Sequence, residues 1–68
     1  MATVKHVISE NDYVELLHPV GDWPAGRTGT VVSDYGDVKL VEIPNDRGEM
    51  LGLIQVPEPQ LKLITKYS

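Results

Sequence analysis

Proline and glycine interrupt this chain so often that a long helix has no place to form. The sequence has six glycines and five prolines in 68 residues, and all of them lie between positions 19 and 59. Proline removes a backbone donor and clashes inside a helix, and glycine weakens a helix by its flexibility. The segments between them are short and rich in Val, Ile, Leu, Thr and Tyr, which is typical of short β-strands. The spacing therefore predicts an all-β domain.

Five strands are predicted in the apolar segments, and two of them include one of the glycines, Gly29 and Gly52. They are expected over residues 13–18, 28–34, 38–43, 49–55 and 62–65. Alternate side chains of a strand point to opposite faces, so one face of each strand supplies the core. The expected core consists of Val14, Leu16, Val31, Val41, Ile43, Leu51, Leu53, Leu61 and Ile64.

The connections between the strands are also predicted by their turn residues. The segment 45–48, Asn-Asp-Arg-Gly, indicates a type I turn that ends in a left-handed glycine. It should join the third and fourth strands as antiparallel neighbours. Residues 35–37 indicate a tight turn, and residues 19–27 a long loop, because they contain two prolines and two glycines. Residues 57–61 indicate one turn of 3₁₀ helix before the last strand.

These elements together predict a small five-stranded barrel with a short 3₁₀ turn before its last strand. Residues 1–9 are interpreted as an N-terminal tail and residues 10–66 as a single domain. A chain of this length buries only about 60% of the surface that its unfolded form exposes, so one domain is the most it can form.

Two stretches of the sequence resemble the opening of small SH3-like barrels. Residues 10–17 contain a D-x-V-x-L strand pattern and residues 24–32 a G-x-x-G-T-V-V pattern, and the likeness continues almost to the C-terminus. The chain resembles a bacterial family of similar length that is known as a domain of unknown function. Its outline is also similar to SH3-like accessory chains of photosynthetic and redox complexes and to the barrel of nitrile hydratase beta subunits. The resemblance implies an SH3-like barrel over residues 10–65, and it leaves the function open because none of these motifs is catalytic.

The charge of the chain restricts which partners it can bind. Ten acidic residues oppose six basic ones, and the formal net charge is −4. The basic residues are scattered among the acidic ones, whereas binding to nucleic-acid phosphates favours clustered Lys and Arg. We therefore expect no nucleic-acid partner. A KOW-like nucleic-acid-binding barrel is kept as an alternative, because other SH3-like barrels bind RNA.

No group of residues has the spacing of a catalytic or metal-binding motif. The absence of cysteine removes disulfides, thiolate metal sites and cysteine nucleophiles. His6 and His18 are isolated and supply too few ligands for a metal. We expect no enzymatic activity and no cofactor. An acidic stretch is interpreted as a solvated rim, or alternatively as a surface for a basic partner or a cation; its members are Asp34, Asp37, Glu42, Asp46 and Glu49.

Trp23 is the most informative single residue for function. It is the one tryptophan of a chain without phenylalanine, and it lies in the proline-flanked loop. Tryptophan is enriched in protein interfaces, where it supplies a large and rigid contact area. The alternative is that its ring caps one open end of the barrel. The interface hypothesis assigns partner binding to Val20, Trp23, Arg27, Tyr35, Asp46 and Arg47.

The sequence thus predicts a small non-enzymatic protein-binding module or accessory subunit. It would present the loop 20–27, the hairpin tip 46–48 and the acidic rim to a larger protein, such as a toxin that it neutralises or an enzyme that it regulates. A homodimer formed through an uncovered strand edge is a further alternative. A cytoplasmic location without membrane contact is expected, since no apolar run approaches the roughly 20 residues that span a bilayer.

Overall fold

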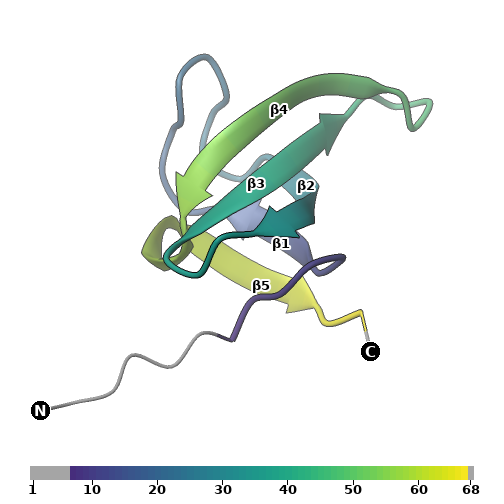
Figure 1. Ribbon diagram of the computed structural model, residues 1–68. Coiled ribbons are helices and arrows are strands. Elements are labelled where there is room, and N and C mark those ends of the chain that lie inside the picture. Colours follow the sequence, from purple (N-terminus) through teal and green to yellow (C-terminus); the bar gives the residue numbers. More distant parts are fainter. Residues whose placement is uncertain (1–6, 68) are drawn as a thin grey trace, which may run out of the picture.

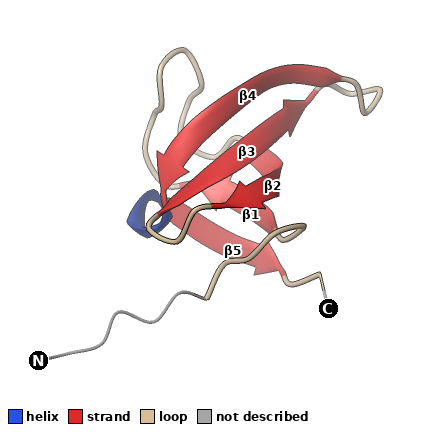
Figure 2. Ribbon diagram, in the orientation of Figure 1, coloured by secondary structure: helices blue, strands red, loops and turns tan. Residues whose placement is uncertain are grey.

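The computed structural model describes residues 7–67, and within this range it contains five strands and no α-helix. Figure 2 shows the strands and the one helical turn. The all-β class and the 3₁₀ turn before the last strand are confirmed, although the first strand ends two residues earlier and the fourth two residues later than predicted. The elements are β1 Tyr13–Leu16, β2 Thr28–Asp34, β3 Val38–Pro44, β4 Met50–Pro57, the 3₁₀ turn η1 Glu58–Gln60 and β5 Leu61–Thr65.

All five strands belong to one antiparallel sheet with the order β4-β3-β2-β1-β5. The sheet is curled, so that β4 and β5 lie on opposite sides of the molecule in Figure 1. Among the described residues no ladder joins these two strands, and the barrel is therefore open between β4 and β5. In the same range no helix is long and apolar enough to cross a membrane.

The turn between β3 and β4 has the structure that its residues predict. The Asn45 amide donates to the Glu49 carbonyl at 2.7 Å, and the Gly48 amide donates to the Asn45 carbonyl at 3.0 Å. Gly48 has a φ of 81°, in the left-handed region that glycine adopts without steric cost. The Asn45 side chain also accepts hydrogen bonds from the Arg47 and Glu49 amides. The antiparallel pairing of β3 with β4 is confirmed.

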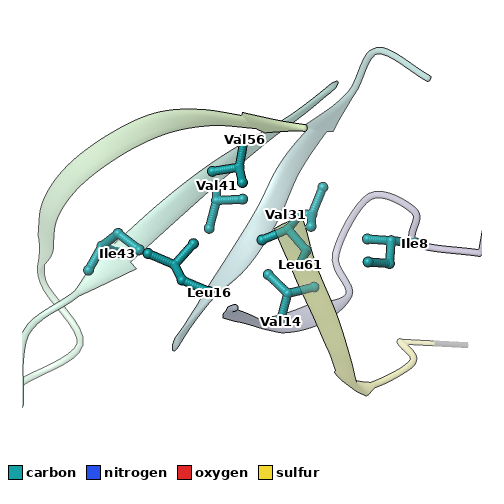
Figure 3. Close-up of a cluster of buried hydrophobic side chains, with 8 residues drawn as sticks. All are labelled: Ile8, Val14, Leu16, Val31, Val41, Ile43, Val56 and Leu61. Atoms are coloured by element: carbon teal, nitrogen blue, oxygen red, sulfur yellow. The ribbon is translucent and has the colours of Figure 1, made fainter. Parts of the chain in front are cut away.

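A single cluster of apolar side chains fills the concave side of the sheet. Figure 3 shows this cluster, with Ile43 near one end and Ile8 at the other. Six of the predicted core residues belong to it, and Val56 and Ile8 were not predicted. The described residues of the cluster are Ile8, Val14, Leu16, Val31, Val41, Ile43, Val56 and Leu61.

The prediction that Leu51 and Leu53 lie in the core is wrong, because β4 contains a bulge. Their exposed fractions are 53% and 49%. Pro44 pairs with Met50, but Ile43 pairs with Gly52, so Leu51 is an extra residue in β4. Without this bulge the ladder would place both leucines opposite inward-facing residues of β3. A shift of the register by one residue moves every side chain of a strand to the other face of the sheet.

Ile64 is also exposed, contrary to the prediction. In β5 the residues Leu61 and Leu63 pair with Leu16 and Val14, whose side chains are buried. Ile64 is the next residue after Leu63 and therefore faces outward, with 43% of its surface exposed.

The segment before β1 is packed on the domain through Ile8 and Asp12. Ile8 is buried in the core cluster, so the packed part of the chain includes residues 7–9. The buried Asp12 carboxylate accepts hydrogen bonds from the Ser9 amide, the Tyr67 amide and the Lys66 ammonium, at 2.8, 2.9 and 2.7 Å. Burial alone would raise the pKa of Asp12, but these three donors outweigh it and lower the pKa. Asp12 thereby joins both ends of the described chain.

Candidate partner-binding surface

The loop between β1 and β2 is held in one conformation by its own backbone. Val20 and Trp23 exchange two hydrogen bonds of 2.9 Å and form an isolated bridge. At the base of the loop, the Gly26 amide donates to the Leu16 carbonyl and the Leu16 amide to the Arg27 carbonyl, both at 2.8 Å. A loop braced in this way can present side chains with little loss of conformational entropy on binding.

Trp23 packs against the core but keeps part of its ring in solvent. The side chain is half-buried and contacts the core cluster together with Val20. A Cβ atom on Gly52 would lie 2.6 Å from the Trp23 Cζ2 atom, so the ring approaches the backbone of β4 as closely as glycine allows. This packing agrees with the capping interpretation of Trp23, and the interface interpretation stays a prediction.

Arg27 links this ring to the end of β3. Its guanidinium carbon lies 5.5 Å from the centroid of the Trp23 ring, within the range of a cation–π interaction. The Nη2 atom of Arg27 also donates a hydrogen bond to the carbonyl of Pro44, the last residue of β3. The first contact lies within the loop, and the second connects the loop to the β3–β4 hairpin.

The tip of that hairpin supplies two more of the predicted residues. Asp46 and Arg47 are exposed and follow directly after Pro44 and Asn45. Because Arg27 contacts Pro44, the base of the loop and the start of the hairpin turn lie at the same end of the sheet, although the loop and the hairpin tip project to different sides of the molecule in Figure 1. We call this group the loop–hairpin surface; it consists of Val20, Trp23, Arg27, Asp46 and Arg47.

Tyr35 is not part of the loop–hairpin surface. It follows the end of β2, whereas Arg27 precedes the start of the same seven-residue strand. A strand rises by about 3.3 Å per residue, so eight residues of extended chain separate the two positions by up to about 26 Å. Tyr35 is 61% exposed in the turn between β2 and β3. The predicted grouping of Tyr35 with Trp23 and Val20 does not occur.

The acidic stretch does not form one continuous rim either. Asp34 and Asp37 lie beside the start of β3, and Asp46 and Glu49 lie beyond its end. Asp34 also pairs with Lys39, at 2.5 Å from Nζ. A basic partner would therefore meet two separate acidic groups.

Lys39 is a buried cation that the sequence interpretation missed. Its side chain is fully buried, and its ammonium contacts Asp34 Oδ1 at 2.5 Å, the Gly36 carbonyl at 2.7 Å and Glu58 Oε1 at 3.0 Å. Asp34 and Gly36 accept hydrogen bonds from two of its three N–H donors, and Glu58 forms an ion pair with it. The alternation of Lys39 with Val41 and Ile43 indicates that it points inward, but its acceptors come from other elements.

The protonation of Lys39 follows from this environment. Burial acts most strongly and lowers the pKa, but the hydrogen bonds and charges of Asp34 and Glu58 together outweigh burial, so the pKa of Lys39 is raised. A lysine that holds its proton and is paired in this way is a poor nucleophile or base. We interpret this cluster as structural, joining the β2–β3 turn to η1.

The described residues contain no group of three or more side chains that could hold a metal ion. His18 is exposed after β1. His6 lies outside the described residues, as does most of the predicted N-terminal tail.

Comparisons with known proteins give no relative. No family model matches the chain, and neither a curated protein nor a solved structure matches it at a significant level.

Proposed function

We propose that this chain is a small non-enzymatic protein-binding module that holds a larger protein at its loop–hairpin surface. The observation that carries the proposal is the contact of the half-buried Trp23 with Gly52 and with Arg27, whose guanidinium also donates to the Pro44 carbonyl at the start of the hairpin turn. Tryptophan and arginine are the residue types that most often dominate binding energy in protein interfaces.

The charge of the residues assigned to this surface is mixed, because Arg27 and Arg47 are basic and Asp46 is acidic. A partner of mixed charge with an apolar centre suits it better than a uniformly basic one, since opposite charges across an interface set its orientation. Neutralising a toxin or regulating an enzyme are two roles for such a module.

Affinity capture with matched variants tests the proposal. The baits are the wild-type chain, Arg47→Ala, Arg27→Ala and Tyr35→Ala, followed by mass spectrometry of the retained proteins. Arg47 and Tyr35 are both exposed, but Tyr35 lies at the other end of the sheet. The same partner should be retained by the wild type and by Tyr35→Ala, and it should be reduced with the two arginine variants.

Trp23 reports on the same complex without a substitution. Acrylamide quenching of its fluorescence should decrease when the captured partner is added, because the exposed part of the ring becomes covered. Unchanged quenching in a complex, or equal retention by all baits, would place the contact elsewhere and refute the proposal. Retention of nucleic acid instead of protein would favour the KOW-like alternative.

A further inference from the structure

One member of the core cluster does not come from a strand. Of the eight buried apolar residues that the structure describes, seven lie in β1 to β5, and the eighth is Ile8. Figure 3 shows Ile8 at one end of the cluster, on the segment that precedes β1. We call residues 7–10 the N-terminal strap. Within the described range no backbone hydrogen bond joins the strap to a strand, so side chains hold it in place.

Lys66 makes most of the polar contacts that hold the strap. Its ammonium donates to the Val7 carbonyl at 3.0 Å, to the Ser9 hydroxyl at 3.2 Å and to the Asp12 carboxylate at 2.7 Å. The side chain of Lys66 is 45% exposed, so water can replace the two strap acceptors when these hydrogen bonds break. If the strap leaves, Lys66 keeps its ion pair with Asp12, and no buried charge loses its partner.

The strap meets the sheet at a turn with an unusual backbone conformation. Asn11 has a φ of 75°, and among the described residues it is the one non-glycine residue with a positive φ. This conformation is unfavourable for most residues, although asparagine tolerates it better than others. Beyond the turn the chain is fixed to β2, because the Asn11 amide donates to the Val31 carbonyl at 2.7 Å and the Val31 amide donates to the Asp12 carbonyl at 2.9 Å. A moving strap would therefore pivot at the turn formed by residues 10 and 11.

Opening the strap exposes much less of the core than unfolding the barrel does. It removes one of the eight buried apolar side chains and leaves the strand ladders intact. Glu58 would lose the Val7 amide, which lies 3.2 Å from its Oε2 atom, but it would keep the ion pair of its Oε1 atom with Lys39. Segments with few buried apolar contacts and exposed hydrogen bonds open locally, at a lower free energy than the whole domain.

We propose that the N-terminal strap is a lid, which opens about Asn11 and withdraws Ile8 from the core while the barrel stays folded. Lys66 is the latch of this lid, and the open state uncovers the end of the core cluster that Ile8 fills in the closed state. The lid does not rest on the proposed function. Trp23 contacts Gly52, which pairs with Ile43, and Ile43 and Ile8 lie near opposite ends of the cluster in Figure 3. Each inference can fail without the other.

The first experiment measures how fast a buried cysteine reacts with a thiol reagent under native conditions, which is clean because the chain has no cysteine. Ile8→Cys and Ile43→Cys are matched variants, since the two isoleucines are 3% and 0% exposed. Ile8→Cys should react about ten times faster or more, because opening of the strap alone exposes it. Urea unfolding of both variants corrects the rates for any loss of global stability. Equal corrected rates would overturn the proposal, because both cysteines would then be exposed by unfolding only.

The second experiment tests the latch by adding Lys66→Met to each cysteine variant, with Lys62→Met as the control at an exposed lysine of β5. Lys66→Met should raise the rate of Ile8→Cys by about tenfold, because the closed strap loses two hydrogen bonds, and it should raise the rate of Ile43→Cys much less. Lys62→Met should change neither rate.

Hydrogen exchange of the wild-type chain detects the same opening without a substitution. The Ser9 amide, which donates to the Asp12 carboxylate, should exchange faster than the ladder amides of β2 and β3, which have a strand on each side. A Ser9 amide as protected as those of β3, or an equal rise of both cysteine rates with Lys66→Met, would refute the lid.

Discussion

The two ends of the β3–β4 hairpin are held together by different kinds of contact. At the start of β3, the fully buried Lys39 is surrounded by the acceptors of Asp34, Gly36 and Glu58. At the other end, the half-buried Trp23 packs against Gly52, and the half-buried Arg27 donates a hydrogen bond to Pro44. Arg27 also lies over the Trp23 ring, so this end is held by packing, a cation–π contact and a hydrogen bond.

The difference separates a part of the molecule that stabilises the fold from one that can bind. The N–H donors of a buried, paired ammonium are occupied within the fold and cannot bind a partner. Loss of one of its acceptors destabilises the fold, because a buried charge is then left uncompensated. A half-exposed ring and guanidinium retain surface that a partner can cover. The following predictions test this division, beginning with the largest expected effect.

Replacing Lys39 by Met should reduce the free energy of unfolding by about 3–5 kcal/mol, because it leaves two partly buried carboxylates without their cation. A domain of 68 residues has a total of roughly 3–10 kcal/mol, so the variant should be largely unfolded or close to it. Urea unfolding at neutral pH measures the change. Lys62→Met, at an exposed position in β5, is the control and should stay within about 0.5 kcal/mol of wild type. Equal midpoints for the two variants would contradict the division.

Alkaline pH should remove the same contribution without a substitution. The pKa of Lys39 in the folded chain is raised above the ordinary value of 10.5, which applies to the unfolded chain. The stability from this group is therefore fully present below pH 10.5 and is lost as the pH rises through the folded pKa. Titration of the Lys39 Cε signal by NMR should show a proton that is held to higher pH than in free lysine. A titration at or below the free value would show that the acceptors do not outweigh burial.

Gly52→Ala should cost about 1–3 kcal/mol, because the new methyl group would meet the Trp23 ring in a packed site. The indole should move outward, with a red-shifted emission and stronger quenching by acrylamide. Gln55→Ala, an exposed change in the same strand, should leave the emission unchanged. In a Trp23→Ala background the same glycine substitution should cost clearly less, since the two positions are coupled. Additive effects would show that the ring does not rest on Gly52.

The fold was predictable from local signals wherever a short apolar segment is bounded on both sides by turn residues. β2 has the predicted bounds because Thr28 follows a glycine-rich loop and Asp34 precedes a tight turn. β4 was not predictable in the same way, because Leu51, Gly52 and Leu53 offer apolar residues to both faces. The bulge in β4 determines which leucines are exposed, and no local sequence pattern predicts where it lies.

The members of the candidate site were chosen from their residue types and stay a prediction, whereas their arrangement could not be predicted from the sequence. Trp23 and Arg27 were identified because their residue types favour interfaces, and the hairpin tip because turns are exposed. Tyr35 was grouped with them wrongly, since composition does not say at which end of a strand two loops meet. The contact of Trp23 with Gly52 depends on the conformation of a whole loop, and the acceptors of Lys39 come from two further elements.

Arg27→Ala should have the smallest effect on stability and a large one on binding. It removes one cation–π contact and one hydrogen bond to Pro44, which together stabilise the loop by about 1 kcal/mol. Arg27→Lys keeps the charge but lacks the planar fork, so it should recover little of either property. Urea unfolding measures the first property and retention of the captured partner the second. If Arg27→Ala reduces the free energy of unfolding as much as Lys39→Met does, then both ends of the hairpin stabilise the fold. The proposed division between a stabilising end and a binding end would then be refuted.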